Sequence, residues 1–209
     1  VSNYPSADLE ENVRFLLKQT EEDKQDHMIL GPFPSKEAAA AHLNCPPSEL
    51  EYGAHGVIDE ANGKKRIILD ASIVPLNHRI RRNMPWKGSC PGAPEMEPIM
   101  AVEHHTDGSE CALVKIDAKK AHKRVKILPK DWKHLMTRID LSALPEATEK
   151  EAHYINVLGC YGVASAQFYW GRLMCILHSL VLLLHMSRWL LTYVDEVLEV
   201  MRKPTLWED

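Results

Sequence analysis

The chain has 209 residues, of which 45% are hydrophobic and 26% are charged. This length is enough for one sizeable core, or for one domain with a smaller lobe, and the charged fraction is ordinary for a soluble globular protein. The five cysteines show no CxxC spacing, which argues against a disulfide framework or a zinc site and favours reduced thiols. Residues 1–26 lack the apolar stretch of a secretory signal, so we expect an intracellular protein of the cytoplasm or nucleus, not a secreted one.

The net charge of -4 is unevenly distributed along the chain. Residues 1–63 carry 4 basic and 12 acidic groups, whereas residues 64–134 carry 15 basic and 8 acidic groups. A positive middle segment can hold a phosphate backbone or a triphosphate. The same charge also fits a solvated lysine-rich face, and charge alone leaves the two interpretations open.

In the first third of the chain, residues 8–27 have apolar side chains at helical spacing and predict an amphipathic helix. A short alanine-rich helix is expected over 35–43, before Pro46 and Pro47. Residues 55–70 read as a β-hairpin, because Asn62-Gly63 is a turn signal between two apolar runs.

The middle of the chain gives weaker signals. Residues 71–98 are rich in Pro, Gly and Arg and predict a loop, and a short helix is expected to start within 99–105. The apolar run 111–117 predicts a strand, and residues 119–126 a helix or turn. Residues 138–152 read as a surface insertion, and 153–158 as a strand.

A long apolar helix is predicted over 166–186, and a terminal hairpin over 189–201. The uncharged run 173–187 spans 15 residues, whereas a membrane span needs roughly 20. We therefore expect a buried core helix and no membrane partner.

Carboxylates stand at the ends of two predicted strands. Asp117 closes the run 112–116, and Asp195 with Glu196 forms the acidic turn between Leu190-Leu191 and Val197-Leu198. Two strands that deliver carboxylates to one point can hold a pair of divalent ions, because hard cations prefer oxygen ligands. Such a pair is the machinery of nucleotidyl transfer.

Four segments in order resemble the reverse transcriptases of retroelements such as retrotransposons, over about residues 53–203. The segment 65–70 with 76–79 is similar to the family's basic fingers segment, and 113–125 to the first palm motif. The segment 159–170 is similar to the glycine loop that supports the template and the nascent base pair. The segment 193–196 is similar to the Tyr-x-Asp-Asp hairpin.

The resemblance implies an RNA-directed DNA polymerase, a nucleotidyltransferase that extends a primer on an RNA or DNA template with deoxynucleoside triphosphates. Asp117, Asp195 and Glu196 are then the catalytic residues and ligands of two Mg²⁺ ions, with Mn²⁺ as a substitute. Lys65 and Arg66 neutralise the β- and γ-phosphates. The remaining nucleotide-binding residues that the resemblance implies are Asp70, Ala121, His122, Tyr161 and Gly162.

Three departures from the family pattern keep alternatives open. Glu196 stands where the family has a second aspartate, and catalytic geometry is sensitive to shifts of about 1 Å. His122 replaces the usual aromatic residue that excludes a 2′-hydroxyl. The chain ends at Asp209, before the family's thumb. The alternatives are a catalytically inactive relic that acts as a binding or structural module, and an RNA-templated RNA polymerase with the same palm.

These observations predict an α+β protein made of polymerase fingers and an incomplete palm. We expect an N-terminal acidic helical extension over 1–52, a fingers-like region over 53–110 and a palm-like catalytic region over 111–209. The palm is expected to be an antiparallel sheet with helices packed on one face. In it, the strand that ends at Asp117 lies beside the terminal hairpin, with the helix 166–186 behind.

Overall fold

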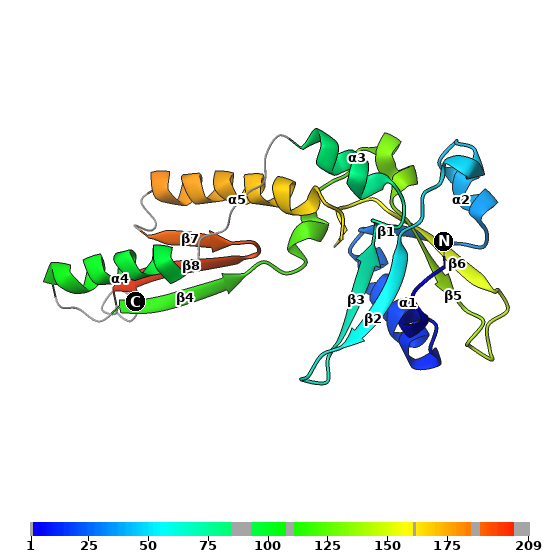
Figure 1. The fold of residues 1–209 in the computed structure, drawn as a ribbon, viewed down its shortest axis with the longest axis horizontal. Helices are drawn as coiled ribbons and strands as arrows, with labels where there is room; N and C mark the ends of the chain where they lie inside the picture. Colours follow the sequence, from blue (N-terminus) through cyan, green and yellow to red (C-terminus); the bar gives the residue numbers. More distant parts are fainter. Residues whose placement is uncertain (1, 85–92, 108–110, 161, 185–188, 203–209) are drawn as a thin grey trace. The chain divides into compact units, whose positions relative to one another are not determined.

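The protein is an α+β protein, and its described part forms two compact units (Figure 1). The computed structural model describes residues 2–84, 93–107, 111–160, 162–184 and 189–202. Unit 1 comprises residues 1–84 and 122–166, and unit 2 comprises residues 85–121 and 167–209. Both units are discontinuous in sequence. The predicted domain boundaries after residues 52 and 110 stay predictions.

Unit 1 contains two small antiparallel β-structures. Strands β1 (Ile29–Phe33), β6 (Glu151–Asn156) and β5 (Met136–Asp140) form a sheet in the order β1-β6-β5, while β2 (Ala54–Asp59) and β3 (Lys65–Asp70) form a hairpin. The helices are α1 (Glu10–Gln25), α2 (Lys36–His42) and α3 (Leu76–Asn83). The short 3-10 helices are η1 (Pro5–Ala7), η2 (Pro47–Glu49), η3 (Ala121–Arg124) and η4 (Pro129–His134). Along the sequence, the boundary between the two units falls within η3, after Ala121.

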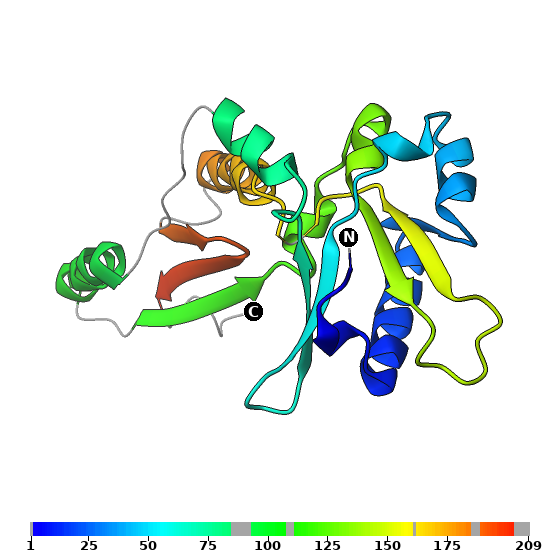
Figure 2. The same cartoon turned by 45° about the vertical axis from the view of Figure 1, so that its right-hand side comes forward.

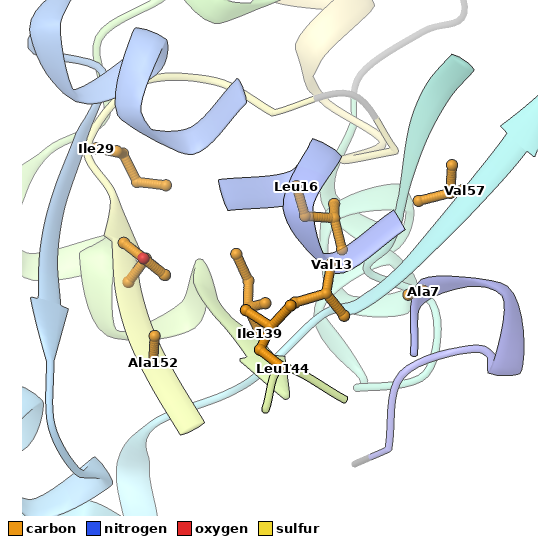
Figure 3. Packing of buried hydrophobic residues seen from close by; sticks show 9 residues of the cluster. Ala7, Val13, Leu16, Ile29, Val57, Ile139, Leu144 and Ala152 are labelled. Carbon is orange, nitrogen blue, oxygen red and sulfur yellow. The ribbon is translucent and has the colours of Figure 1, made fainter. Parts of the chain in front are cut away.

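The main core of unit 1 lies between α1 and its β-structures. Helix α1 starts with Glu10 and Glu11, where negative charge is favourable at a helix N-terminus. Its Val13 and Leu16 are fully buried. They pack with Ile139 and with other apolar residues of the cluster drawn in Figure 3, which include Ala7, Ile29, Val57, Leu144 and Ala152. The predicted helix over 8–27 is therefore confirmed, and its apolar face is in the core.

The β2–β3 hairpin was predicted correctly. Its turn contains Gly63 with a φ of +76°, and the Asn62 side chain accepts a hydrogen bond of 2.9 Å from the Lys64 backbone. Glycine adopts this left-handed conformation without a steric penalty. Ala54 pairs with Asp70 and Asp59 with Lys65, so the strand register is regular along the hairpin.

Two elements differ from the sequence expectations. Residues 76–83 form α3 although a loop was predicted, because Leu76 and Ile80 pack against the cluster of Ala71, Leu135 and Val163. Tertiary packing overrides weak helix propensity here. The expected insertion 138–152 also contains the end of β5 and the start of β6. Both strands pair in register, and Ile139 and Ala152 are buried.

Unit 2 contains one antiparallel sheet and two helices. Strands β4 (Cys111–Asp117), β8 (Glu196–Arg202) and β7 (Leu190–Tyr193) form the sheet in the order β4-β8-β7, as Figure 2 shows. The helices are α4 (Ala93–Asp107) and α5 (Ala166–Leu183). The predicted strand 111–117 does lie beside the terminal hairpin, with β8 between β4 and β7. Helix α4 starts before the predicted 99–105 and continues through Pro98.

Helix α5 is confirmed, but the expectation that it is a buried core helix is wrong for the described part of the chain. Only 17% of this helix is buried, mainly through Ala166, Trp170 and Met174. By length and composition alone the helix could cross a membrane. The expected absence of a membrane partner stays a prediction. Its large exposed apolar residues are Tyr169, Leu173, Ile176, Leu177, Leu180, Leu182 and Leu183, and Leu184 directly after the helix is exposed too.

Candidate functional site

The end of the unit 2 sheet brings two carboxylate-bearing residues opposite one another. Asp117 closes β4 and pairs with Glu196, the first residue of β8. The Ala118 backbone N–H donates to the Asp195 carbonyl at 2.9 Å, which makes Asp117 and Glu196 a non-hydrogen-bonded pair. In such pairs the two Cα atoms lie about 4.5 Å apart and the side chains share one face of the sheet.

Asp195 lies in the two-residue turn between β7 and β8. Its neighbour Val194 has a φ of +52°, in the first turn position, where type II′ hairpins usually have glycine. The Trp170 indole N–H of α5 donates a 2.6 Å hydrogen bond to the Val194 carbonyl, and Trp170 is buried. Helix α5 therefore fixes the turn that carries Asp195.

A lysine lies among these carboxylates. The Lys115 ammonium is 2.5 Å from the Glu196 carboxylate. This hydrogen bond raises the pKa of Lys115, and the charges of Glu196, Asp117 and Asp195 raise it further. This contact was not predictable from the sequence, because it depends on the exact register between β4 and β8.

The chemistry of the carboxylate set suits a hard divalent cation. Asp117, Asp195 and Glu196 supply oxygen ligands only, which is the donor type that Mg²⁺ and Mn²⁺ prefer. These carboxylates do not form a complete ion-binding group in the structure, however. In the described residues, no group of three or more His, Cys, Asp or Glu side chains lies close enough together to hold an ion.

The two predicted phosphate-binding cations lie on β3 of unit 1 and both have acidic partners. The Lys65 ammonium is 3.0 Å from Asp59 and 3.1 Å from Glu11, and its pKa is raised chiefly by the hydrogen bond to Asp59. The Arg66 guanidinium is 2.6 Å from Glu60. Either side chain has to leave these partners before it can bind a triphosphate.

Asp70, at the end of β3, is held by its neighbours. The Tyr4 hydroxyl donates to one of its oxygens at 2.7 Å, and the Ser72 backbone N–H donates to the other at 2.7 Å. The bond from Tyr4 is the main cause that lowers the pKa of Asp70. Asp70 is one of the residues that line a pocket of about 530 Å³, together with Ile68, Asn77, Arg81 and Gly162.

Gly162 lies against the end of β3 in a conformation that only glycine fits. Its φ is +92°, and a Cβ at this position would lie 1.9 Å from the Leu69 carbonyl oxygen. The buried Asn77 side chain donates to the Gly162 carbonyl at 2.8 Å and accepts from the Ala164 backbone at 2.7 Å. Asn77 thus shapes the loop, a role that the sequence did not reveal. The predicted Tyr161 lies outside the described residues.

The predicted nucleotide-binding residues Ala121 and His122 lie in η3. Ala121 is fully buried, and its backbone N–H donates to the Ala118 carbonyl at 3.1 Å. His122 is half-buried, and its carbonyl oxygen would be 2.2 Å from a Cβ at residue 159. Ala121 belongs to unit 2 with the carboxylates. His122 belongs to unit 1 with Lys65, Arg66, Asp70 and Gly162.

A second polar cluster, which the sequence did not reveal, lines a pocket of about 740 Å³ in unit 1. The Tyr52 hydroxyl and His153 Nδ1 lie 2.9 Å apart, and His153 Nε2 is 3.3 Å from Glu151. Glu151 also pairs with Arg138 at 2.8 Å. Burial lowers the pKa of His153 and raises that of Tyr52 to about 12. With the His153 Nε2–H directed at Glu151, Nδ1 accepts a hydrogen bond from the Tyr52 hydroxyl.

Comparison with known proteins does not assign the chain to a family. No model of a protein family matches the chain, and a search of curated proteins finds no relative.

Proposed function

We propose that the chain carries the catalytic centre of a reverse transcriptase-like polymerase, which adds deoxynucleotides to a primer on an RNA or DNA template. The observation that supports this most is the cross-strand pair of Asp117 and Glu196, with Asp195 in the adjoining turn. Strand ends that gather carboxylates at one edge suit a pair of divalent ions. The four segments that resemble reverse transcriptases give the proposal its substrate class.

In this proposal Asp117, Asp195 and Glu196 would hold two Mg²⁺ or Mn²⁺ ions. The ions would supply positive charge that neutralises the reacting phosphate. Phosphoryl transfer needs positioning and charge neutralisation more than covalent participation by the protein. The protein's contribution is therefore the geometry of the strand ends and of the turn that Trp170 fixes.

The unit 1 residues serve the nucleotide and the template. Lys65 and Arg66 exchange their acidic partners for the β- and γ-phosphates. Asp70 and Gly162 bind the nucleotide, and His122 lies under its sugar. Ala121 of unit 2 and Tyr161 complete the proposed nucleotide-binding set. We also propose that the protein acts in the cytoplasm or nucleus and needs no membrane.

Primer extension with Mg²⁺ tests the proposal. Asp117→Asn removes one ligand charge at nearly constant size, and we expect it to reduce extension by at least a hundredfold, because the loss acts on the transition state. Glu97→Gln is the matched control, since Glu97 is an exposed carboxylate of α4 in the same unit. Equal extension by the wild type and Asp117→Asn contradicts the proposal.

One observation favours a second function, an inactive nucleic-acid-binding module. Glu196 is bound to Lys115 rather than free to ligate. A module of this kind binds primer–template in a filter or gel assay, with the strong salt dependence of phosphate contacts. It gives no extension with either Mg²⁺ or Mn²⁺, and Asp117→Asn leaves its binding unchanged.

A further inference from the structure

Asp117 and Glu196 face each other across β4 and β8 as like charges. Directly opposed like charges destabilise a sheet, because their side chains approach closely in a non-hydrogen-bonded pair. The turn adds a third carboxylate, that of Asp195. A chain that folds before it binds a cation needs another positive charge at this edge.

Lys115 supplies that charge from the same face of the sheet. It lies two residues before Asp117 and pairs with Leu198, so it is the diagonal neighbour of Glu196. Diagonal neighbours lie about 7–8 Å apart, within reach only of long side chains. The ammonium spans this gap and bonds to Glu196 at 2.5 Å, although more than half of the Lys115 side chain is exposed.

We propose that Lys115 is a built-in competitor for the divalent cation: it neutralises Glu196 in the metal-free chain and must release it when an ion binds. The inference rests on the proposed function, because it assumes that these carboxylates bind the catalytic ions. It extends that function by assigning the metal-free site its own counter-ion and by predicting a lowered cation affinity.

Glutamate at position 196 fits this role better than aspartate. The additional methylene lengthens the carboxylate arm on the diagonal along which Lys115 reaches. An aspartate at the same register has a shorter arm and leaves a wider gap to the ammonium. The residue that departs from the reverse transcriptase pattern is therefore the one that holds the lysine.

The experiment measures Mn²⁺ binding to the whole chain by the loss of the free-ion electron paramagnetic resonance signal. Lys115→Gln removes the competing charge, and a nearby unit charge changes the affinity of an exposed site for a divalent ion by about three- to tenfold. We expect Lys115→Gln to bind Mn²⁺ more tightly by that factor at low salt, with a smaller gain at 0.5 M KCl. Lys115→Arg keeps the charge and is expected to bind like the wild type.

Two further variants distinguish failure of the competitor role from failure of the metal site itself. Lys130→Gln removes an exposed lysine of η4 in the other unit and is expected to leave Mn²⁺ binding unchanged. Asp117→Asn is expected to abolish binding. If Lys115→Gln binds no more tightly than the wild type while Asp117→Asn loses binding, the metal site stands and the competitor role is wrong. If no variant binds Mn²⁺, the metal-ion part of the proposed function fails and the competitor role fails with it.

A second readout does not depend on affinity. Without metal, Lys115→Gln leaves the Asp117–Glu196 pair without its counter-ion, so its thermal midpoint is expected to fall below that of the wild type. Added Mn²⁺ is then expected to raise the midpoint of this variant by more than it raises that of the wild type. An equal rise in both proteins overturns the proposal.

Discussion

Val194 carries the least favourable backbone conformation of the candidate site. A β-branched residue with a φ of +52° is an outlier, and the left-handed region costs an L-residue about 1–2 kcal/mol. The surrounding contacts hold it there: Tyr193 pairs with Glu196, and Trp170 binds the Val194 carbonyl. Strain of this kind is commonly found at functional sites.

We therefore predict that Val194→Gly stabilises unit 2. Relief of the left-handed valine outweighs the greater flexibility of glycine in the unfolded chain, which costs about 0.5–1 kcal/mol, so the net gain is up to about 1 kcal/mol. Urea unfolding at 25 °C measures it. Val114→Gly is the control, because Val114 lies within β4 without a positive φ and its loss should destabilise the sheet. A similar loss of stability in both variants would mean that Val194 is unstrained.

At the scale of elements, the β7–β8 hairpin and helix α5 act together. The hairpin has a two-residue turn, and the Val194 carbonyl in this turn accepts a hydrogen bond from the Trp170 indole of α5. A single hydrogen bond contributes about 0.5–1.5 kcal/mol, and the loss of a buried partner costs more. The position of Asp195 should therefore depend on this tryptophan.

Trp170→Phe is predicted to reduce both stability and cation binding. Phenylalanine keeps most of the apolar contact but cannot donate to the Val194 carbonyl, so we expect a loss of about 1–3 kcal/mol and weaker Mn²⁺ binding. Trp132→Phe is a matched control, because Trp132 in unit 1 donates a 3.0 Å bond to the Ile127 carbonyl. It should cost similar stability and leave Mn²⁺ binding intact. Equal Mn²⁺ binding by both variants would refute the role of Trp170.

The elements that the sequence predicted well carry strong local signals. The hairpin of β2 and β3 follows from Asn62-Gly63, and β4 and α5 follow from long apolar runs. Helix α3 was missed because its polar sequence folds only when Leu76 and Ile80 pack against residues far away in the chain. The exposure of α5 was also missed, since an apolar run does not reveal how much surface its neighbours cover.

In the candidate site, too, some features were predictable from the sequence and others were not. The apolar runs predicted the strands that end at Asp117 and flank the acidic turn, and the resemblance to reverse transcriptases implied that these strands lie side by side. The partners that modify the site were not predictable. Lys115 reaches Glu196 only in one register, Trp170 reaches the turn only through the packing of α5, and Asn77 bridges a loop 85 residues away.

At the scale of the whole molecule, acid sensitivity should come from unit 1. His55 in β2 is buried, and burial lowers its pKa to about 4, with Lys123 adding to the effect and a hydrogen bond to the Arg138 backbone opposing it. Burial also lowers the pKa of His153. Both side chains are neutral in the fold and become charged more readily when the chain unfolds.

The sign of the pH dependence follows from these shifts. Because the folded pKa of His55 lies below the unfolded value of about 6.5, its contribution to stability is complete above pH 6.5. This contribution is lost as the pH falls toward 4, because His55 becomes protonated in the unfolded chain at a higher pH than in the folded protein. One group with this shift contributes about 3 kcal/mol to the change.

We predict that the unfolding free energy of the wild type falls between pH 7 and pH 4.5, and that His55→Leu flattens this fall by about 2–3 kcal/mol. Urea titrations at several pH values measure the slope, which is informative even if the substitution shifts stability at neutral pH. His42→Leu is the control, since His42 is an exposed histidine of α2 and its loss should leave the slope unchanged. A wild-type slope in His55→Leu would show that folding does not lower the pKa of His55. The acid sensitivity would then come from other groups such as His153, whose pKa burial also lowers.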